Sequence, residues 1–184
     1  MTVFSLSQLT PSGCFYQNQL DFTRILNESF LPAADLTTHT FQPALARQGA
    51  ERVQREFENI SRYNILACVV FALPDRSDAA EKFAFTQSSV DLARVAIALE
   101  RYRLAHEKYP DTLAVLEPQF LNPVPHDVIG GAPLHYRLTK DGQFVLYSIG
   151  WNDEDDGGKV ALALDFPRRQ DLSSGDWVWR YPPP

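Results

Sequence analysis

The feature that most constrains the fold is an amphipathic stretch running from about Asp78 to Lys108. Its apolar residues recur at steps of three and four, the spacing of one face of an α-helix; they are Phe85, Leu92, Val95, Ala96, Leu99 and Tyr102. A helix of this length spans about 45 Å, longer than a small domain usually needs. Tyr109-Pro110 should end it, because a residue that precedes proline disfavours the helical conformation.

Beyond Pro110 the pattern changes from helix to strand. Residues 118–133 are rich in proline and contain Gly130-Gly131, which predicts an irregular loop. Strands are predicted next at 134–139 and 144–149, because the Asp141-Gly142 pair between them is a strong hairpin signal. Further strands are predicted at 159–164 and 176–181, with a polar loop at 165–175 between them.

The N-terminal part, residues 1–79, is predicted to be a helical region. A charged amphipathic stretch at 44–60 predicts a solvent-facing helix, and residues 33–43 resemble an irregular connection. Helices followed by antiparallel strands predict an α+β fold, in which residues 80–184 form one domain: a long helix, at 80–108, packed on a small antiparallel sheet.

Charge and cysteine content exclude several classes. The formal net charge of −6 and the scattered basic residues argue against nucleic-acid binding, which needs a basic stripe. Cys14 and Cys68 do not define a disulfide framework, and whether they pair is left open. The longest apolar run, Ile65–Leu73, is about half the length of a bilayer-spanning helix. The chain is therefore either cytoplasmic or the soluble part of an anchored envelope protein.

An acidic, glycine-rich loop at 150–158 is the strongest chemical signal. Oxygen ligands on a flexible loop suit a hard cation such as calcium, and Asn152, Asp153, Asp155 and Asp156 offer them. The spacing is not that of an EF-hand, because Gly157 falls where a ligand is required. The alternative is a solvated hairpin connection without metal, in which the glycines serve the backbone alone.

An ordered series of short motifs resembles the head of the type II secretion major pseudopilin. The motifs are the helix end Tyr102-Arg103 with Tyr109-Pro110, the turn Pro125-His126-Asp127, His135-Tyr136, Leu146-Tyr147-Ser148-Ile149-Gly150, the acidic loop, and Asp176-Trp177-Val178-Trp179. The resemblance covers residues 85–181. The whole chain is also similar to a group of envelope-associated proteins from planctomycete and verrucomicrobial bacteria. Before residue 85 the chain departs from the pseudopilin, with polar helix in place of the basic leader and the apolar filament segment.

This resemblance implies a non-catalytic structural or assembly domain of a cell-envelope protein, located in the periplasm or envelope. It implies protein partners or self-assembly, and contact with a membrane only through a segment absent from this chain. It also implies calcium, with ligand roles for Asn152, Asp155 and Asp156 and closure of the site by Asp176.

Two other functions remain open from the residues. Trp151, Trp177 and Trp179 would suit a peptide- or glycan-binding platform if they were exposed, although packing against the helix is the commoner use of such residues. A hydrolase would need an acid–base pair such as His126-Asp127, and adjacent residues seldom hold a productive geometry. No nucleophile elbow, phosphate loop or zinc-protease motif occurs in the sequence, so we expect no catalytic activity.

Overall fold

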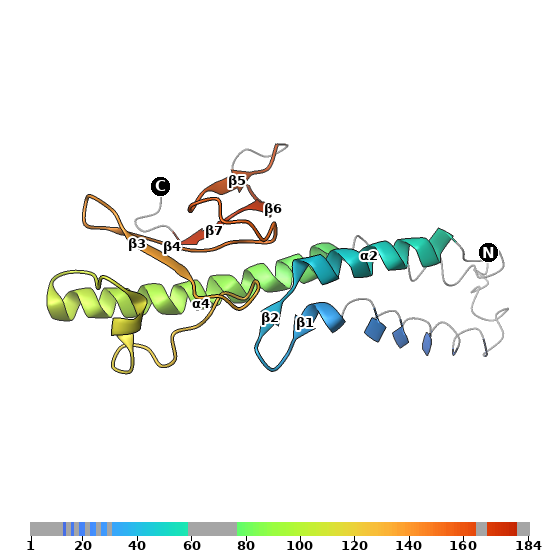
Figure 1. The fold of residues 1–184 in the computed structure, drawn as a ribbon, viewed down its shortest axis with the longest axis horizontal. Helices are drawn as coiled ribbons and strands as arrows, with labels where there is room; N and C mark the ends of the chain where they lie inside the picture. The colour runs from blue at the N-terminus through green and yellow to red at the C-terminus, as the bar shows by residue number, and fades with distance from the viewer. Residues whose placement is uncertain are drawn as a thin grey trace, which may run out of the picture. The chain divides into compact units, whose positions relative to one another are not determined.

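The structure is a computed structural model that describes residues 31–58, 77–164 and 169–179, together with single positions near the N-terminus, namely Gly13, Tyr16, Gln19, Leu20, Thr23, Arg24, Asn27 and Glu28. The chain divides into two compact units (Figure 1). The first comprises residues 1–33 and 44–77, and the second comprises 34–43 and 78–184. Cys14, Cys68 and the apolar run at 65–73 lie outside the described residues.

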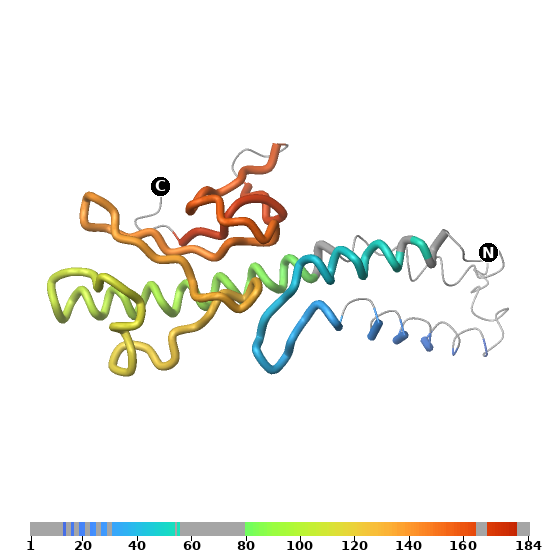
Figure 2. Tube along the Cα trace, viewed as in Figure 1, coloured from blue at the N-terminus to red at the C-terminus, as the bar shows by residue number. Residues whose placement is uncertain are grey.

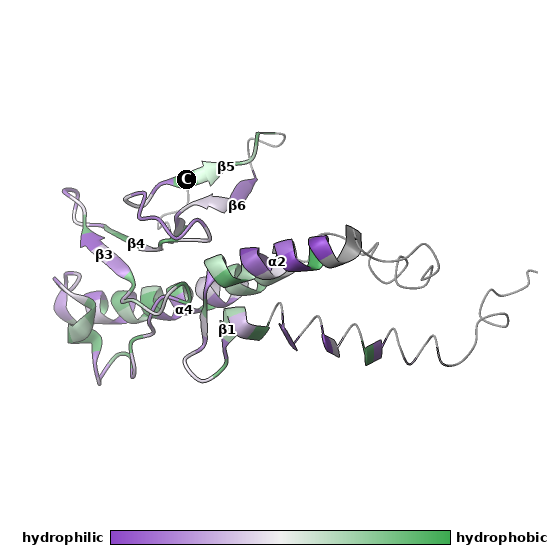
Figure 3. Ribbon diagram, turned by 45° about the vertical axis from the view of Figure 1, so that its right-hand side comes forward, coloured by the Kyte–Doolittle hydropathy of each residue, from purple (hydrophilic) through white to green (hydrophobic). Residues whose placement is uncertain are grey.

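The first unit contains the 3₁₀ turn η3 (Leu31–Ala33) and helix α2 (Pro43–Glu58). Helix α2 confirms the helix predicted at 44–60. Its charged residues Arg47, Glu51 and Arg52 are exposed, and much of the helix is purple in the hydropathy colouring of Figure 3. Proline at its first position suits a helix start, where the missing N–H has no intrahelical partner to lose.

The second unit is built on helix α4 (Ser77–His106), which confirms the long predicted helix. Four members of the predicted stripe are buried, namely Leu92, Val95, Ala96 and Leu99, while Phe85 and Tyr102 are half-buried. After the helix ends, the buried Tyr109 hydroxyl turns back and donates to the Glu100 carboxylate. Burial, followed by this neighbouring carboxylate, raises the pKa of Tyr109 to about 12. The described residues contain no helix long and apolar enough to cross a membrane.

Helix α4 packs on a three-stranded antiparallel sheet with the order β3-β4-β7 (Figures 1 and 2). The strands are β3 (His135–Leu138), β4 (Phe144–Ser148) and β7 (Trp177–Trp179). One buried apolar cluster joins the helix to the sheet and to the 3₁₀ turn η4 (Leu113–Leu116), and it consists of Leu92, Val95, Ala96, Ala98, Leu99, Tyr109, Leu116, Leu134, Phe144 and Leu146. Phe85 also meets Trp177 edge to face, with ring centroids 5.4 Å apart. The predicted α+β fold is therefore confirmed.

One predicted loop proves to contain a strand. Strand β5 (Val160–Leu162) pairs with β6 (Gln170–Gly175), which occupies part of the loop predicted at 165–175. The sequence QDLSSG lacks the alternation of a half-buried strand, so its extended backbone comes from pairing with β5 rather than from its own pattern. The predicted strands consequently belong to two sheets rather than to one meander.

The connection predicted at 33–43 is also more ordered than its sequence suggests. It forms the hairpin of β1 (Ala34–Asp35) and β2 (Thr40–Phe41). Phe41 N donates to the Val128 carbonyl at 2.7 Å, and Gly130 N donates to the Phe41 carbonyl at 3.1 Å. These bonds explain why residues 34–43 belong to the second unit rather than to the N-terminal helical region.

Candidate functional site

The acidic loop begins where β4 ends, at a point where the backbone must pass very close to another segment. Gly150 has a φ of +76°, and a Cβ placed there would lie 2.3 Å from the Gly175 carbonyl oxygen. Any other residue would therefore combine a left-handed conformation with a backbone collision. The glycine at 150 is required by this approach of β4 to the end of β6.

A single buried carboxylate holds the loop closed. Asp176, immediately before β7, is fully buried. Its Oδ1 accepts from Asp156 N at 3.3 Å, and its Oδ2 accepts from Gly158 N at 2.6 Å and from Lys159 N at 3.2 Å. The Asp176 amide in turn donates to the Lys159 carbonyl at 2.8 Å. The loop backbone thus forms a concave set of N–H donors around one anion.

The charge on Asp176 is under opposing influences. Burial raises the pKa of its carboxyl, the three backbone donors lower it, and the neighbouring Asp156 carboxylate raises it. Asp156 itself accepts from Asn152 Nδ2 at 2.9 Å. The structure therefore brings together Asn152, Asp156 and Asp176, three of the five predicted ligands.

The other two predicted ligands lie apart from this group. Asp155 Oδ1 accepts from the Tyr147 hydroxyl at 3.1 Å and from Gly157 N at 2.9 Å, and its Oδ2 lies 3.5 Å from His135 Nδ1. Because the Gly157 amide binds it, the pKa of Asp155 is lowered. Asp153 is exposed, with a φ of +62°. Asp155 therefore fastens the loop to β3 and β4, since His135 also stacks on Tyr147 with centroids 4.9 Å apart.

The donor set fits a hard cation in chemistry and only partly in arrangement. Asn152, Asp156 and Asp176 can offer oxygen atoms, which calcium prefers. Across the described residues, however, no three His, Cys, Asp or Glu side chains gather closely enough to hold a metal ion. Any calcium here would need loop carbonyls to complete its shell, with Asp153 and Asp155 outside it.

A second buried aspartate, Asp127, anchors the proline-rich loop. It is 1% exposed and accepts from Ser148 Oγ at 2.7 Å, Ile129 N at 2.9 Å and Ile149 N at 3.0 Å. Burial raises the pKa of this carboxyl, and the same three donors lower it. Both of its oxygens are thus occupied by structural donors, while the adjacent His126 side chain is exposed.

Sequence reasoning did not identify Asp127 as an anchor. The available signal was an aspartate in a proline-rich segment, because an Asp side chain in a turn can bind the backbone N–H two residues on. The bond from Ile129 N to Asp127 Oδ1 is such a turn. The remaining partners lie on and after β4, so only the tertiary structure supplies them.

The tryptophans proposed as a ligand platform are largely inside the molecule. Trp151 is 5% exposed and Trp177 is 1% exposed, and Trp179 is half-buried. Trp177 Nε1 donates to the Leu172 carbonyl at 3.1 Å. The expected packing of Trp177 against the long helix is confirmed by its edge contact with Phe85. Neither Trp151 nor Trp177 offers a ring face to a ligand.

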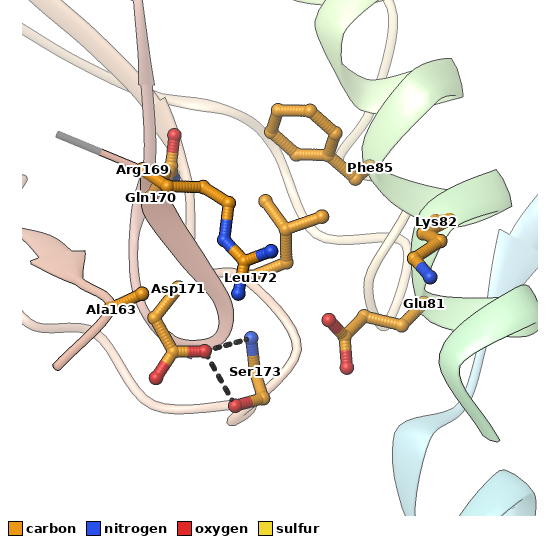
Figure 4. Close-up of a pocket in the computed structure, with 9 residues that line it drawn as sticks. All are labelled: Glu81, Lys82, Phe85, Ala163, Arg169, Gln170, Asp171, Leu172 and Ser173. Atoms are coloured by element: carbon orange, nitrogen blue, oxygen red, sulfur yellow. Dashed lines mark hydrogen bonds between the residues drawn. The ribbon is translucent and has the colours of Figure 1, made fainter. Parts of the chain in front are cut away.

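A cavity of about 490 Å³ lies between the first turns of α4 and strand β6 (Figure 4). Phe85 and Leu172 give it an apolar wall, and charged groups of both signs line the rest. Asp171 is turned onto Ser173, accepting from its amide at 3.0 Å and its hydroxyl at 2.7 Å. The lining thus has no excess of one charge that would select a ligand class.

Comparison of the chain with protein-family models, with curated proteins and with solved structures finds no match.

Proposed function

We propose that this chain is a non-catalytic structural or assembly domain of a bacterial cell-envelope protein, similar to the head of a type II secretion pseudopilin. The observation that carries the proposal is the use of the two buried aspartates. Asp127 and Asp176 each bind backbone amides, so the oxygens of both carboxylates already serve structural hydrogen bonds. These groups brace loops around the helix–sheet core, which is the work of a scaffold rather than of a reaction centre.

We further propose that calcium binds at the acidic loop. Asp156 and Asp176 would supply carboxylate oxygens, and Asn152 would supply its amide oxygen. The support is the closeness of the two residues, since Asp176 Oδ1 accepts from the Asp156 amide at 3.3 Å. Burial first, and then the neighbouring Asp156 carboxylate, raises the pKa of Asp176. A bound cation would neutralise this pair and stabilise the closed loop.

Thermal unfolding with calcium and with a chelator tests the metal. A ligand that binds only the native state raises the midpoint, so we expect a higher midpoint with calcium. Asp156→Asn should abolish this difference, whereas Asp153→Asn, which changes the same charge in the same loop, should retain it. Identical midpoints of the unchanged protein in calcium and in chelator would refute the calcium proposal.

The location and the absence of catalysis have separate tests. After fractionation of the source cells, antibodies against this domain should detect it in the envelope or periplasmic fraction, and detection only in the cytosol would contradict the location. A panel of hydrolase substrates should give no turnover with the purified protein. Turnover that disappears in His126→Ala would replace the structural proposal with an enzymatic one.

A further inference from the structure

Helix α4 has a second apolar face, opposite the one that packs on the sheet. Four large apolar side chains on it are exposed: Phe83 at 71%, Val90 at 50%, Ile97 at 61% and Leu104 at 74%. Single exposed apolar residues are ordinary on protein surfaces. These four, however, follow one another at intervals of seven residues along one helix, which scattered exposure does not explain.

The geometry separates this heptad stripe (Phe83, Val90, Ile97 and Leu104) from the core. Val90 and Leu92 differ by two residues, which is about 200° around a helix of 3.6 residues per turn. The same angle separates the exposed Ile97 from Val95 and from Leu99, both of which are buried. The heptad stripe thus lies on the side of α4 away from its buried face.

A seven-residue repeat selects the kind of partner. Seven residues fall about 20° short of two full helical turns, so a stripe with this period winds slowly around its helix. Another helix that crosses with a left-handed twist can follow such a stripe, whereas a flat sheet cannot. Of the three intervening positions, Thr86 and Ala93 are small enough to admit a neighbouring helix, and Glu100 is half-buried and already accepts from Arg103 and Tyr109. The Thr86 hydroxyl donates to the Lys82 carbonyl at 2.7 Å, so it needs no partner across an interface.

The charged residues beside the heptad stripe indicate which charge the partner helix should carry. Arg94 and Arg101 follow Val90 and Ile97 by four residues and form a basic edge beside the stripe. Both arginines are exposed. Arg101 donates to the Phe120 carbonyl at 3.2 Å, so this bond does not neutralise its charge. Arg94 pairs with Asp91 at 3.0 Å while its side chain stays 48% exposed.

A second copy of this chain would not complement that edge. In coiled-coil pairing the two positions that flank the stripe meet those of the partner helix. On α4 they hold no carboxylate; the residues are Gln87, Arg94 and Arg101 on one side and Lys82, Ser89, Ala96 and Arg103 on the other. If two copies of α4 paired in antiparallel orientation, arginines would face arginines. If they paired in parallel, no ion pair would form between the flanking positions.

We propose that the heptad stripe of α4 docks an α-helix of another protein, one with an apolar seven-residue repeat flanked by acidic residues. This inference rests on the assembly role proposed above and specifies its partner. It requires α4 to be folded on its sheet, but it requires neither bound calcium nor an envelope location. Its failure is therefore distinguishable from the failure of those proposals.

A pair of synthetic peptides tests this inference. Each is a helix of about four heptads with an apolar repeat, and they differ only in carrying Glu or Lys at the flanking positions. Fluorescence anisotropy with the full chain should detect binding of the Glu peptide, weakened by salt, and little binding of the Lys peptide. Ile97→Asn should weaken binding at least roughly tenfold, the size of one lost apolar anchor. Arg101→Gln should weaken it roughly threefold, as expected of an exposed ion pair.

Leu138→Asn is the matched control, because Leu138 is an exposed leucine on strand β3 rather than on α4. It should leave binding unchanged, and circular dichroism should show that all three variants keep the helix content of the parent. Failure of the Glu peptide to bind, equal binding of both peptides, or binding insensitive to Ile97→Asn would overturn the inference. So would a dimer in sedimentation experiments that Ile97→Asn dissociates, because the occupant would then be a second copy.

Discussion

The proline-rich loop at 118–133 and the acidic loop at 150–158 are each held by one buried aspartate, but in opposite ways. Asp127 belongs to the loop that it anchors and reaches outward to Ser148 and Ile149. Asp176 lies outside the acidic loop, which wraps its own backbone amides around that carboxylate. The loop with the most carboxylates therefore depends on one that it does not contain.

The acidity of a loop therefore says little about which carboxylate organises it. Burial and the direction of the donors decide the matter. Asp153 and Glu154 are exposed and add only charge to the surface. Asp127 and Asp176 are buried and hold the loop backbones by hydrogen bonds. Charged groups are seldom buried without such partners, because the loss of water must be offset by hydrogen bonds.

The largest effect should come from Gly150→Ala at the start of the acidic loop. The new Cβ would combine left-handed strain with a collision against the Gly175 carbonyl, and we expect a loss of about 4 kcal/mol of unfolding free energy. Gly157→Ala is the control, because it shares the positive φ but has open space around its Cβ; it should cost about 1 kcal/mol. Urea unfolding measures both, and equal losses would show that the close approach is unimportant.

Next in size should be Asp127→Asn in the proline-rich loop. In the variant, an NH₂ group replaces one carboxylate oxygen and faces groups that themselves donate hydrogen bonds. We therefore expect a loss of about 3 kcal/mol of unfolding free energy. Ser148→Ala, which removes one of the three donors, should cost less. If Asp127→Asn left the urea midpoint unchanged, the proline-rich loop would not need its anchor and the comparison of the two loops would fail.

Asp176→Asn should cost somewhat less, about 2 kcal/mol, because the amides it releases belong to a surface loop and can turn to water. Hydrogen exchange should localise the change: the amides of Gly158 and Lys159 should exchange faster, while Ile129 N, bound to Asp127, keeps its protection. Faster exchange spread evenly over both loops would mean that the two anchors are not independent.

The smallest effect should be the pH dependence of Asp155→Asn. The pKa of Asp155 is below its ordinary value of 3.8 in the folded protein, so its ionised form stabilises the fold above that pH. The difference in melting temperature between the parent and this variant should therefore be present near neutral pH. It should vanish as the pH falls below 3.8 and through the folded-state pKa.

The pH dependence of Asp127→Asn should have the opposite sense. Burial raises the pKa of Asp127, so the folded state holds its proton more tightly than the unfolded state does. Its ionisation therefore reduces stability as the pH rises from 3.8 through the higher folded-state pKa. The difference in melting temperature between the parent and Asp127→Asn should therefore widen as the pH falls across this range, whereas the difference for Asp155→Asn narrows.

The sequence alone determined the elements whose signals are local. The three- and four-residue spacing of Leu92, Val95 and Leu99 predicts α4 and its buried face, and Asp141-Gly142 predicts the β3–β4 hairpin. Trp177 was correctly expected to pack against the helix. Each of these features depends on periodicity or turn chemistry within a short stretch, so the local sequence contains the information that predicts it.

Tertiary structure decided what depends on partners distant in the chain. Strand β6 is extended because β5 pairs with it, and the hairpin at 34–43 is ordered because Phe41 bonds with the segment at 128–130. The predicted ligand set divides for the same reason, since Tyr147 and His135 draw Asp155 away from Asp156 and Asp176. A carboxylate binds whichever donors the fold brings near it, and sequence spacing does not contain that information.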